Sequence, residues 1–371
     1  MDDQNIRIFV CTLEGTLFAY VFNPEDGTIE TSFTAKDHVG RIRSLNASAD
    51  GLVITGGDDE NFKVYNYIKK KSLSSIHGIC GASQKILNTE KFFISCQDNG
   101  HIYIAGKSDY AIYHHIKAFK SSCIDIDLHT SGRLLLCLSK TGRFALWNLL
   151  TVTPIFHKKI KAEIEHVKFI NDEFILLQGK SFMYVFSLRT LAITQEIKMD
   201  NDDFIVDLEI ARFNGQIFIV VGTEKGFVYV YNDRNFLEED SMTVSYIKFK
   251  CYEKRVKKLK HIGNYLVTIC TEGDISVWDL EEIYQRTDYT DKIYIESFSS
   301  IFDYTIQSRA ILLDVAMENR DKVKSAKKPL TIDMASLPSA KKHIPRTELK
   351  GKPTRKIQKY RRLAKKIGQR N

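Results

Sequence analysis

The sequence is poor in tryptophan, proline and long hydrophobic runs. It has 2 Trp and 6 Pro among 371 residues, although 43% of the residues are hydrophobic. The longest apolar runs, such as Leu134 to Leu138 and Ile217 to Val221, are short. A membrane-spanning helix needs roughly 18 apolar residues in succession, and the acidic start Met1-Asp2-Asp3 is unlike the cationic start of a signal peptide. We therefore expect a soluble, intracellular protein with no membrane partner.

Patterns for metal binding and catalysis are also missing. The 7 Cys form no Cys-x-x-Cys pair, which argues against a zinc site or a disulfide framework and favours buried free thiols. There is no glycine-rich phosphate loop, His-Glu-x-x-His zinc motif or Gly-x-Ser-x-Gly nucleophile elbow. The adjacent His114-His115 is interpreted as a surface pair. We predict no enzymatic activity, no cofactor, no metal and no small-molecule substrate.

One pattern recurs along the chain: an apolar strand, a polar turn that often ends in Gly, and an alternating strand that ends in an aromatic residue. It is clearest over residues 265–279, which end in Trp278-Asp279. Aligned strand ends give seven equivalent positions, spaced 39 to 47 residues apart: Tyr20, Tyr65, Ala105, Trp147, Phe186, Tyr231 and Trp278. A period of roughly 40–45 residues is typical of WD40 blades. The sequence predicts an all-β, seven-bladed WD40 propeller over residues 1–321.

Each blade should contain four antiparallel strands around a central channel. In the second blade we expect strands near residues 41–47, 52–55, 62–66 and 71–76. WD repeats tie each blade together through a His and an Asp that hydrogen bond toward the Trp position, and here those residues would be His38, Asp59 and Tyr65. Trp147, Trp278 and Asp279 hold matching positions in other blades. We assign all of these side chains a structural role.

The N-terminus supplies only part of a blade. Residues 6–12 and 16–22 have the pattern of a second and a third strand, so the innermost strand of that blade is missing. An unpaired edge strand is a liability. We therefore predict that residues 310–316 pair with residues 6–12 and close the ring. The chain should then leave beside the N-terminus, on the face opposite to the connections that lead into the inner strands.

Charge is divided unevenly along the chain. Residues 322–371 hold 17 Lys and Arg against 2 acids, a net charge of +15, so the rest of the chain carries −7 of the total of +8. We predict that this basic tail is disordered in isolation, with a helix near residues 354–367, where Ile357, Tyr360 and Leu363 recur at helical spacing. An acidic body with a basic tail points to a polyanionic partner or a nuclear import signal.

Two basic regions are candidate contacts for rRNA or a protein partner. One is the run 254–261, which together with Lys117, Lys120, Lys158, Lys159 and Lys161 should make several connections into inner strands basic. Ordinary solvated loop charges are the alternative. The other region is the tail, for which binding in an RNA–protein assembly is favoured over import alone or a membrane surface. The candidate residues are Lys254, Arg255, Lys257, Lys258, Lys260, Lys352, Arg355, Lys356, Lys359, Arg361, Arg362, Lys365, Lys366 and Arg370.

Specific stretches resemble one family of WD-repeat proteins. Gly56-Gly57-Asp58-Asp59-Glu60 through Tyr65-Asn66 resembles the first complete repeat of the PAK-interacting-protein family, called maintenance-of-killer factors in yeast. His129-Thr-Ser-Gly132 and Leu146-Trp147-Asn148-Leu149 are similar to its fourth blade. The resemblance implies nucleolar factors that act on precursors of the large ribosomal subunit and help to load a ribosomal-like protein. For animal members it also implies restraint of PAK kinases.

We therefore expect a non-enzymatic scaffold in large (60S) ribosomal subunit biogenesis, located in the nucleus and nucleolus. Its partners would be pre-60S proteins, large-subunit rRNA and, through the resemblance, a ribosomal-like protein. Two alternatives remain. One is a signalling adaptor that binds and restrains a PAK-type kinase, and the other is a propeller subunit of another RNA-processing complex.

Overall fold

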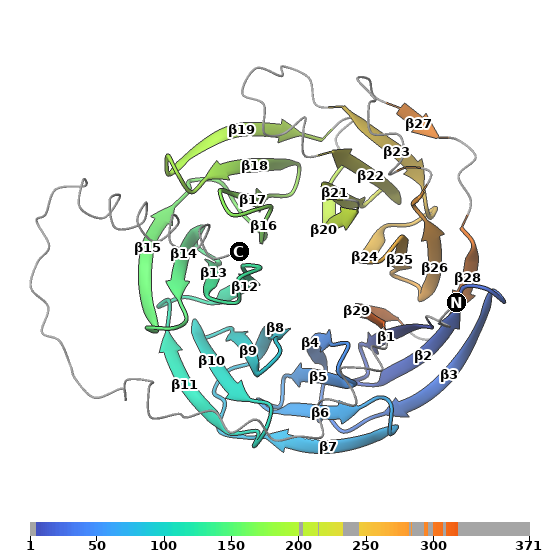
Figure 1. The fold of residues 1–371 in the computed structure, drawn as a ribbon, viewed down its shortest axis with the longest axis horizontal. Coiled ribbons are helices and arrows are strands. Elements are labelled where there is room, and N and C mark those ends of the chain that lie inside the picture. The colour runs from blue at the N-terminus through green and yellow to red at the C-terminus, as the bar shows by residue number, and fades with distance from the viewer. Residues whose placement is uncertain are drawn as a thin grey trace, which may run out of the picture.

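Seven β-sheets form a ring around a central opening in the computed structural model of the chain (Figure 1). The structure describes residues 5–199, 203–213, 215–232, 245–281, 283, 293–295, 300–306 and 309–317. Each sheet is one blade, so the all-β, seven-bladed propeller predicted from the repeat is confirmed.

The strands follow one another outward from the channel within each blade. The first three blades are β29 (Ala310–Met317), β1 (Ile6–Thr12), β2 (Leu17–Asn23) and β3 (Thr28–Ala35); β4 (Ile42–Ala47), β5 (Leu52–Gly57), β6 (Phe62–Asn66) and β7 (Lys71–Ile76); and β8 (Ser83–Asn88), β9 (Phe92–Gln97), β10 (His101–Gly106) and β11 (Ile112–Lys117). The fourth and fifth blades are β12 (Cys123–Leu128), β13 (Leu134–Ser139), β14 (Arg143–Asn148) and β15 (Thr153–Lys159); and β16 (His166–Phe169), β17 (Phe174–Gln178), β18 (Phe182–Ser187) and β19 (Ala192–Lys198). The sixth and seventh blades are β20 (Ile205–Phe213), β21 (Gln216–Thr223), β22 (Phe227–Asn232), β23 (Tyr246–Lys250) and β27 (Ile293–Ile295); and β24 (Val256–Ile262), β25 (Tyr265–Cys270), β26 (Asp274–Asp279) and β28 (Phe302–Thr305).

Apolar side chains pack between neighbouring blades. The second strand of a blade is apolar on both faces because another sheet covers each face, and every residue of β13 is buried. At the aromatic end of the third strand, Phe186 of the fifth blade packs edge-on against Phe144 of the fourth, with ring centroids 5.1 Å apart. Where Ala105 replaces the aromatic residue, Phe93 and Tyr103 lie in the same cluster. These aromatic rings fill the wedge between adjacent sheets.

Glycine is required where a turn meets the connection to the next blade. Gly226 ends the turn between β21 and β22 and has a φ of +81°. A Cβ there would lie 2.0 Å from the carbonyl oxygen of Tyr252, in the connection into the next blade. The same approach occurs at Gly100, within 2.4 Å of Phe119 O, and at Gly142, within 2.8 Å of Ile160 O. This contact explains why the repeated turn often ends in Gly.

The predicted closure of the ring is present. β29 pairs with β1 in antiparallel register from Ile6 opposite Met317 to Thr12 opposite Ala310, and it becomes the inner strand of the first blade (Figure 1). Met317 lies beside Ile6, at the end of the strand away from the connections into the inner strands. The basic tail lies outside the described residues, so its direction and its helix remain predictions.

Two features differ from the sequence-based picture. The short strand β27 adds to the outside of the sixth blade, parallel to β23, although the chain around it links β26 and β28 of the seventh blade (Figure 1). Only three residues form this strand, so no alternating pattern signals it. The cysteines also differ from the expectation of burial, because Cys80 is exposed and Cys251 is half-buried.

Candidate functional site

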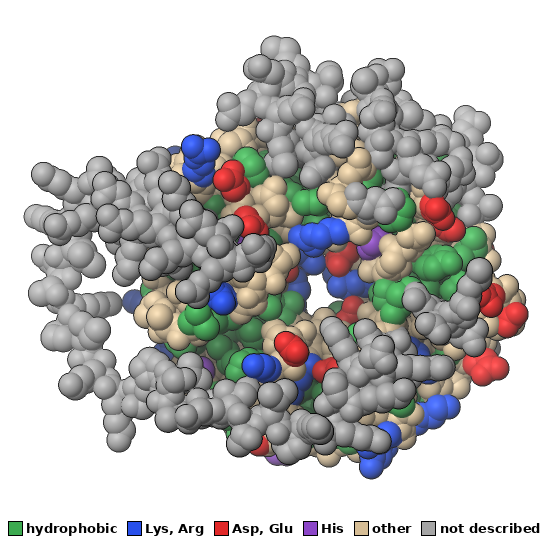
Figure 2. All heavy atoms as spheres, in the orientation of Figure 1, with side chains coloured by type: hydrophobic (Ala, Val, Ile, Leu, Met, Phe, Trp, Pro, Cys, Tyr) green, Lys and Arg blue, Asp and Glu red, His purple; other side chains and the backbone are tan. Residues whose placement is uncertain are grey.

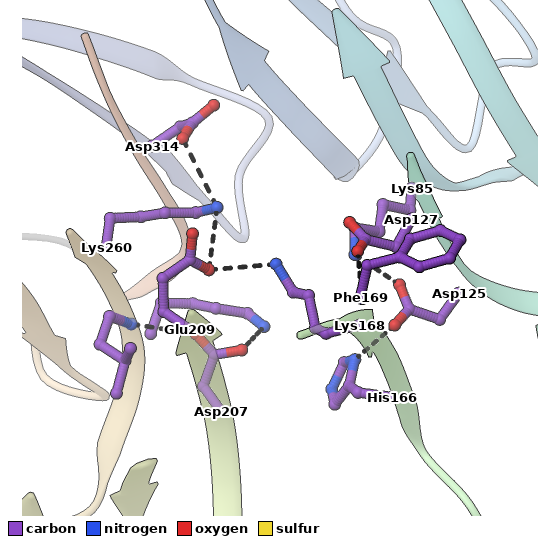
Figure 3. Close-up of polar contacts among 12 residues, drawn as sticks. Lys85, Asp125, Asp127, His166, Lys168, Phe169, Asp207, Glu209, Lys260 and Asp314 are labelled. Carbon is purple, nitrogen blue, oxygen red and sulfur yellow. Dashed lines mark hydrogen bonds and ion pairs between the residues drawn. The ribbon is translucent and has the colours of Figure 1, made fainter. Parts of the chain in front are cut away.

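The central channel is lined by charged side chains from the inner strands (Figure 3). We call these residues the channel ring: Lys85 on β8, Asp125 and Asp127 on β12, His166 and Lys168 on β16, Asp207 and Glu209 on β20, Lys258 and Lys260 on β24, and Asp314 on β29. The charge changes sign from one blade to the next around most of the ring. Figure 2 shows basic and acidic side chains gathered around the open centre.

Ion pairs join each of these strands to its neighbour. The ammonium of Lys168 lies 3.2 Å from a carboxylate oxygen of Glu209. Lys260 reaches both ways, to Glu209 at 3.5 Å and to Asp314 at 3.7 Å. Lys258 contacts Asp207 at 2.6 Å. Three successive blade junctions are therefore bridged by charge.

A second set of contacts extends the ring through the third, fourth and fifth blades. Asp125 on β12 receives Lys85 from β8 at 2.7 Å and His166 from β16 at 3.3 Å. The Asp125 side chain is 1% exposed, whereas those of Lys85 and His166 are 25% and 30% exposed. The carboxylate is thus buried between two half-buried cationic or polar partners.

The acids of the ring also bind backbone N–H groups of the following inner strand. Asp125 accepts from the N–H of Val167 at 2.9 Å, and Asp207 accepts from Leu259 at 3.0 Å. Asp314 accepts from Ala47 at 2.6 Å, across the closed junction of the ring. Inner strands of adjacent blades do not pair with each other, so their channel-facing N–H groups need other acceptors. Carboxylates meet this need with charge-assisted hydrogen bonds.

The ring shifts the pKa values of its members in both directions. Burial alone would raise the pKa of Glu209, but Lys168 and Lys260 outweigh it and lower the pKa to about 2. Burial raises the pKa of Asp127 and Asp314, because the lysines nearby offset only part of the cost of desolvation. Most charges of the ring are therefore neutralised inside the channel, and they hold adjacent blades together.

The tie expected in the second blade has a definite geometry. Nδ1 of His38 lies 2.9 Å from an Asp59 carboxylate oxygen, and Nε2 lies 2.8 Å from the Thr55 hydroxyl. The Asp59 carboxylate also accepts from the N–H of Val39. Tyr65 is buried, but its hydroxyl has no hydrogen-bond partner among the described residues, so the expected link from this group to Tyr65 is not formed. Burial, followed by the charge of Asp37, raises the pKa of that hydroxyl. The His38 imidazole thus links the loop before β4 to Thr55 on β5 and to Asp59 in the turn that follows β5.

The two tryptophans behave differently. Nε1 of Trp278 donates to the Thr268 hydroxyl at 2.9 Å, and the Tyr252 hydroxyl meets the same oxygen at 2.8 Å. In the seventh blade Tyr252 thus occupies the role that His38 has in the second. The indole N–H of Trp147 has no hydrogen-bond partner within the described part of the chain. Asp279 accepts from the N–H of Glu281 at 2.9 Å and shapes a turn.

The basic run at residues 254–261 is split by the structure. We expected the whole run to be a connection, but Val256–Ile262 is the inner strand β24, because Val256 and Leu259 are buried against the sixth blade. Lys258 and Lys260 therefore point to the channel acids. Lys254 pairs with Glu272, and Arg255 donates to the Thr271 hydroxyl at 3.0 Å. Burial and the charges of Arg255 and Lys258 lower the pKa of Lys257.

The other predicted contact residues also divide into one with a partner inside the protein and several that are exposed. Lys158 lies over the Phe186 ring at 4.9 Å, whereas Lys117, Lys120, Lys159 and Lys161 are exposed. The nine candidate residues of the tail, from Lys352 to Arg370, lie outside the described residues. Sequence reasoning missed the acids of the ring. Asp125 with Asp127, and Asp207 with Glu209, are two residues apart in expected inner strands, a spacing that places both carboxylates on one face.

Comparison with known proteins finds relatives at modest identity. No family model matches the chain. The chain is 22% identical over 250 residues to Shk1 kinase-binding protein 15 of Schizosaccharomyces pombe, covering 65% of this chain and 68% of the relative. It is 23% identical over 295 residues to the p21-activated protein kinase-interacting protein 1-like of Danio rerio, covering 75% and 74%. Protein MAK11 of Saccharomyces cerevisiae is 20% identical over 287 residues, covering 67% and 69%.

These relatives, at modest identity, support the WD-repeat family of PAK-interacting proteins and MAK11. The seven-bladed fold agrees with these relatives. Relatives of this family carry names that refer to kinase binding, which supports a propeller that acts as an interaction scaffold. Among the described residues, none of the helical segments has the length and apolar character to cross a membrane, and no group of three metal-ligating side chains comes together there.

Proposed function

We propose that this member of the PAK-interacting and MAK11 family is a non-enzymatic scaffold for assembly of the large ribosomal subunit, located in the nucleus and nucleolus. Pre-60S proteins, a ribosomal-like protein among them, would bind the propeller. Large-subunit rRNA would contact its basic regions. The resemblance to ribosome-biogenesis factors supports this proposal, and so does the propeller architecture.

The division of charge carries the proposal. The channel lysines Lys168, Lys258 and Lys260 are neutralised by acids of adjacent blades, so they add little to the charge that a partner meets. By contrast, residues 322–371 hold 17 Lys and Arg against 2 acids, while the rest of the chain has a net charge of −7. A polyanion is the expected partner of such a tail, because each neutralised phosphate releases counterions. Propellers offer protein partners a broad rigid surface on the same molecule.

The experiment is affinity purification of the tagged full chain at moderate salt, followed by sequencing of the RNA that accompanies it. We expect large-subunit rRNA precursors to be enriched. The matched variant ends after residue 321 and lacks the tail. Loss of the RNA with this variant would assign RNA binding to the tail, and its retention would assign the binding to the propeller. Recovery of small-subunit or other RNA alone would contradict the proposal.

A kinase-binding adaptor is the second candidate. It is favoured by the names of two relatives, Shk1 kinase-binding protein 15 and p21-activated protein kinase-interacting protein 1-like. This function predicts a kinase in the same purification, a cytoplasmic location and no effect of removing residues 322–371. Imaging of the tagged protein separates the two candidates, because the scaffold should concentrate in the nucleolus.

A further inference from the structure

A basic pocket opens between the third and fourth blades, away from the channel. It has a volume of about 1100 Å³ and lies on the face that carries the connections into the inner strands. Its walls are the ends of β10 and β11 on one side and of β14 and β15 on the other, and the connection at residues 118–121 crosses between them. The Lys, Arg and His residues that line it are Lys117, Lys120, Arg143, Lys159, His101 and His157.

The four cations of the pocket have no counter-charge among the residues that the structure describes. No Asp or Glu is among the described residues that line it, and none of the four forms an ion pair within the described ranges. Each of their side chains belongs to an exposed residue. The lysines of the channel ring show the opposite arrangement, since Lys85, Lys168, Lys258 and Lys260 all reach carboxylates. The pocket therefore presents unneutralised positive charge on two walls.

The strand register concentrates this charge. Arg143 lies directly opposite Lys159 across β14 and β15, and His101 lies opposite Lys117 across β10 and β11. Residues in direct register have Cα atoms roughly 4.5–5.5 Å apart, and like charges in such pairs destabilise a sheet. A bound anion between Arg143 and Lys159 would relieve this repulsion.

The imidazole on the blade-three wall is held in a defined position. Nδ1 of His101 lies 3.0 Å from Nε2 of His115, whose ring stacks on Tyr103 with centroids 4.6 Å apart. Burial first, and then the charge of Lys117, lower the pKa of His101. At neutral pH the ring is therefore uncharged and available for stacking or hydrogen bonding. Phe119, half-buried, adds an aromatic face to the same pocket.

We propose that this pocket binds the phosphodiester backbone of single-stranded RNA, with a base against the aromatic side chains. Cations on two walls fit successive phosphates, whereas one phosphorylated side chain would need a single cluster. Aromatic rings beside a basic groove are the usual means by which proteins hold unpaired bases. The proposal deepens the proposed function, on which it rests, by assigning part of the RNA contact to the propeller in addition to the tail.

The test uses the purified full chain and a fluorescently labelled single-stranded RNA. Lysine modification followed by mass spectrometry measures which amines the RNA protects. We expect protection of Lys117, Lys120 and Lys159. Lys69 and Lys71 are exposed lysines at the turn between β6 and β7, on the other face, and should react equally with and without RNA.

Matched double variants measure the charge contribution. For single strands, log K falls with log salt at a slope of about −0.7 per phosphate contact. K117A/K159A should weaken binding and reduce the magnitude of that slope by up to about 1.4. K69A/K71A removes the same charge from the other face and should leave the slope unchanged. Because all four side chains are exposed, both variants should fold.

Two outcomes would contradict the proposal that the pocket binds RNA. One is an unprotected Lys117 and Lys159 together with equal slopes for the two double variants, which would confine RNA binding to the tail. The other is protection of the pocket by a phosphopeptide and not by RNA. Neither outcome would contradict the assembly function, because pre-rRNA could still be recovered in the purification from cells. Conversely, RNA protection in the pocket with no pre-rRNA recovered from cells would support the pocket and contradict the assembly function.

Discussion

The hydroxyl of Thr268 joins two aromatic side chains inside the seventh blade. It accepts from Trp278 and contacts Tyr252, and Thr268 itself is fully buried. Thr268→Val removes the oxygen that accepts from the Trp278 indole N–H, whereas the Tyr252 hydroxyl keeps its hydrogen bond to the backbone carbonyl of Thr268 at 3.0 Å. An unsatisfied buried donor costs about 1–3 kcal/mol. We therefore expect the free energy of unfolding to fall by about that amount in urea titrations.

Thr268→Ser is the control for this substitution. It keeps the oxygen and loses only a methyl group, so it should be clearly more stable than Thr268→Val. Equal unfolding midpoints for the two variants would show that packing and not hydrogen bonding explains the position. The measurement isolates one link of the blade tie, because Trp278 and Tyr252 stay in place.

The turn between β21 and β22 depends on the close approach of another element. Gly226→Ala places a Cβ 2.0 Å from Tyr252 O and 2.4 Å from Lys254 O, so the connection into the seventh blade must shift. Gly215→Ala is the matched control, since Gly215 has a φ of +77°, similar to the +81° of Gly226, with nothing within 4 Å. A positive φ costs both variants about 1 kcal/mol. Thermal unfolding should show a markedly larger loss for Gly226→Ala; equal losses would contradict the contact.

β29 contributes a whole strand to ring closure. Removal of residues 310–371 would leave the edge of β1 without a partner from Ile6 to Thr12 and would uncover apolar side chains that now share a cluster with Leu313, among them Ile8 and Val10. Free edges of this kind promote association between chains. We expect the shortened protein to aggregate, as measured by light scattering, and to lose a cooperative thermal transition.

A chain that ends after residue 321 is the control for the truncation, because it keeps β29 and loses the tail. It should unfold at nearly the same temperature as the full chain. If removal of residues 310–371 left the thermal transition unchanged, the closure by β29 would make no contribution to stability. The comparison separates strand closure from any effect of the basic tail.

Across the whole molecule, the channel ring makes stability depend on pH. The folded protein holds the pKa of Glu209 at about 2, below its ordinary value of 4.5. A carboxylate with a lowered pKa stabilises the folded state when it is ionised, so this contribution is present above pH 4.5 and disappears as the pH falls toward 2. The largest difference that such a shift allows is about 3 kcal/mol.

Glu209→Gln tests this prediction. At neutral pH the variant should be less stable than the natural chain, because Lys168 and Lys260 lose their shared carboxylate. The difference in free energy of unfolding should shrink as the pH falls from 4.5 to 2. A difference that stays constant over this range would mean that the ion pairs of Glu209 do not stabilise the ring. Burial raises the pKa of Asp127 and Asp314, so the comparison between the two chains is more informative than the acid midpoint alone.

The pattern of residues alone predicts the number of blades, the four-strand plan of a blade and the closure of the ring. The repeat marks the blades because each must present an apolar strand to its neighbours, and most also place a glycine where the turn meets the connection that follows. The missing inner strand at the N-terminus required a partner, and the apolar stretch at residues 310–316 was available to provide it. Strand pairing and packing between blades require particular residue types at fixed places in each repeat, so the sequence pattern reveals them.

Which basic residues are neutralised depends on the folded ring and could not be predicted from the sequence. Lys258 and Lys260 belong to a run that is as basic as any in the propeller, yet they face acids of adjacent blades. Lys117 and Lys159, which look alike in sequence, come together around a pocket without a carboxylate. Partners in adjacent blades lie tens of residues apart, as Lys258 and Asp207 do. Because the energy of an ion pair depends on the distance between the charged atoms and on their burial, it is decided only when the ring has closed.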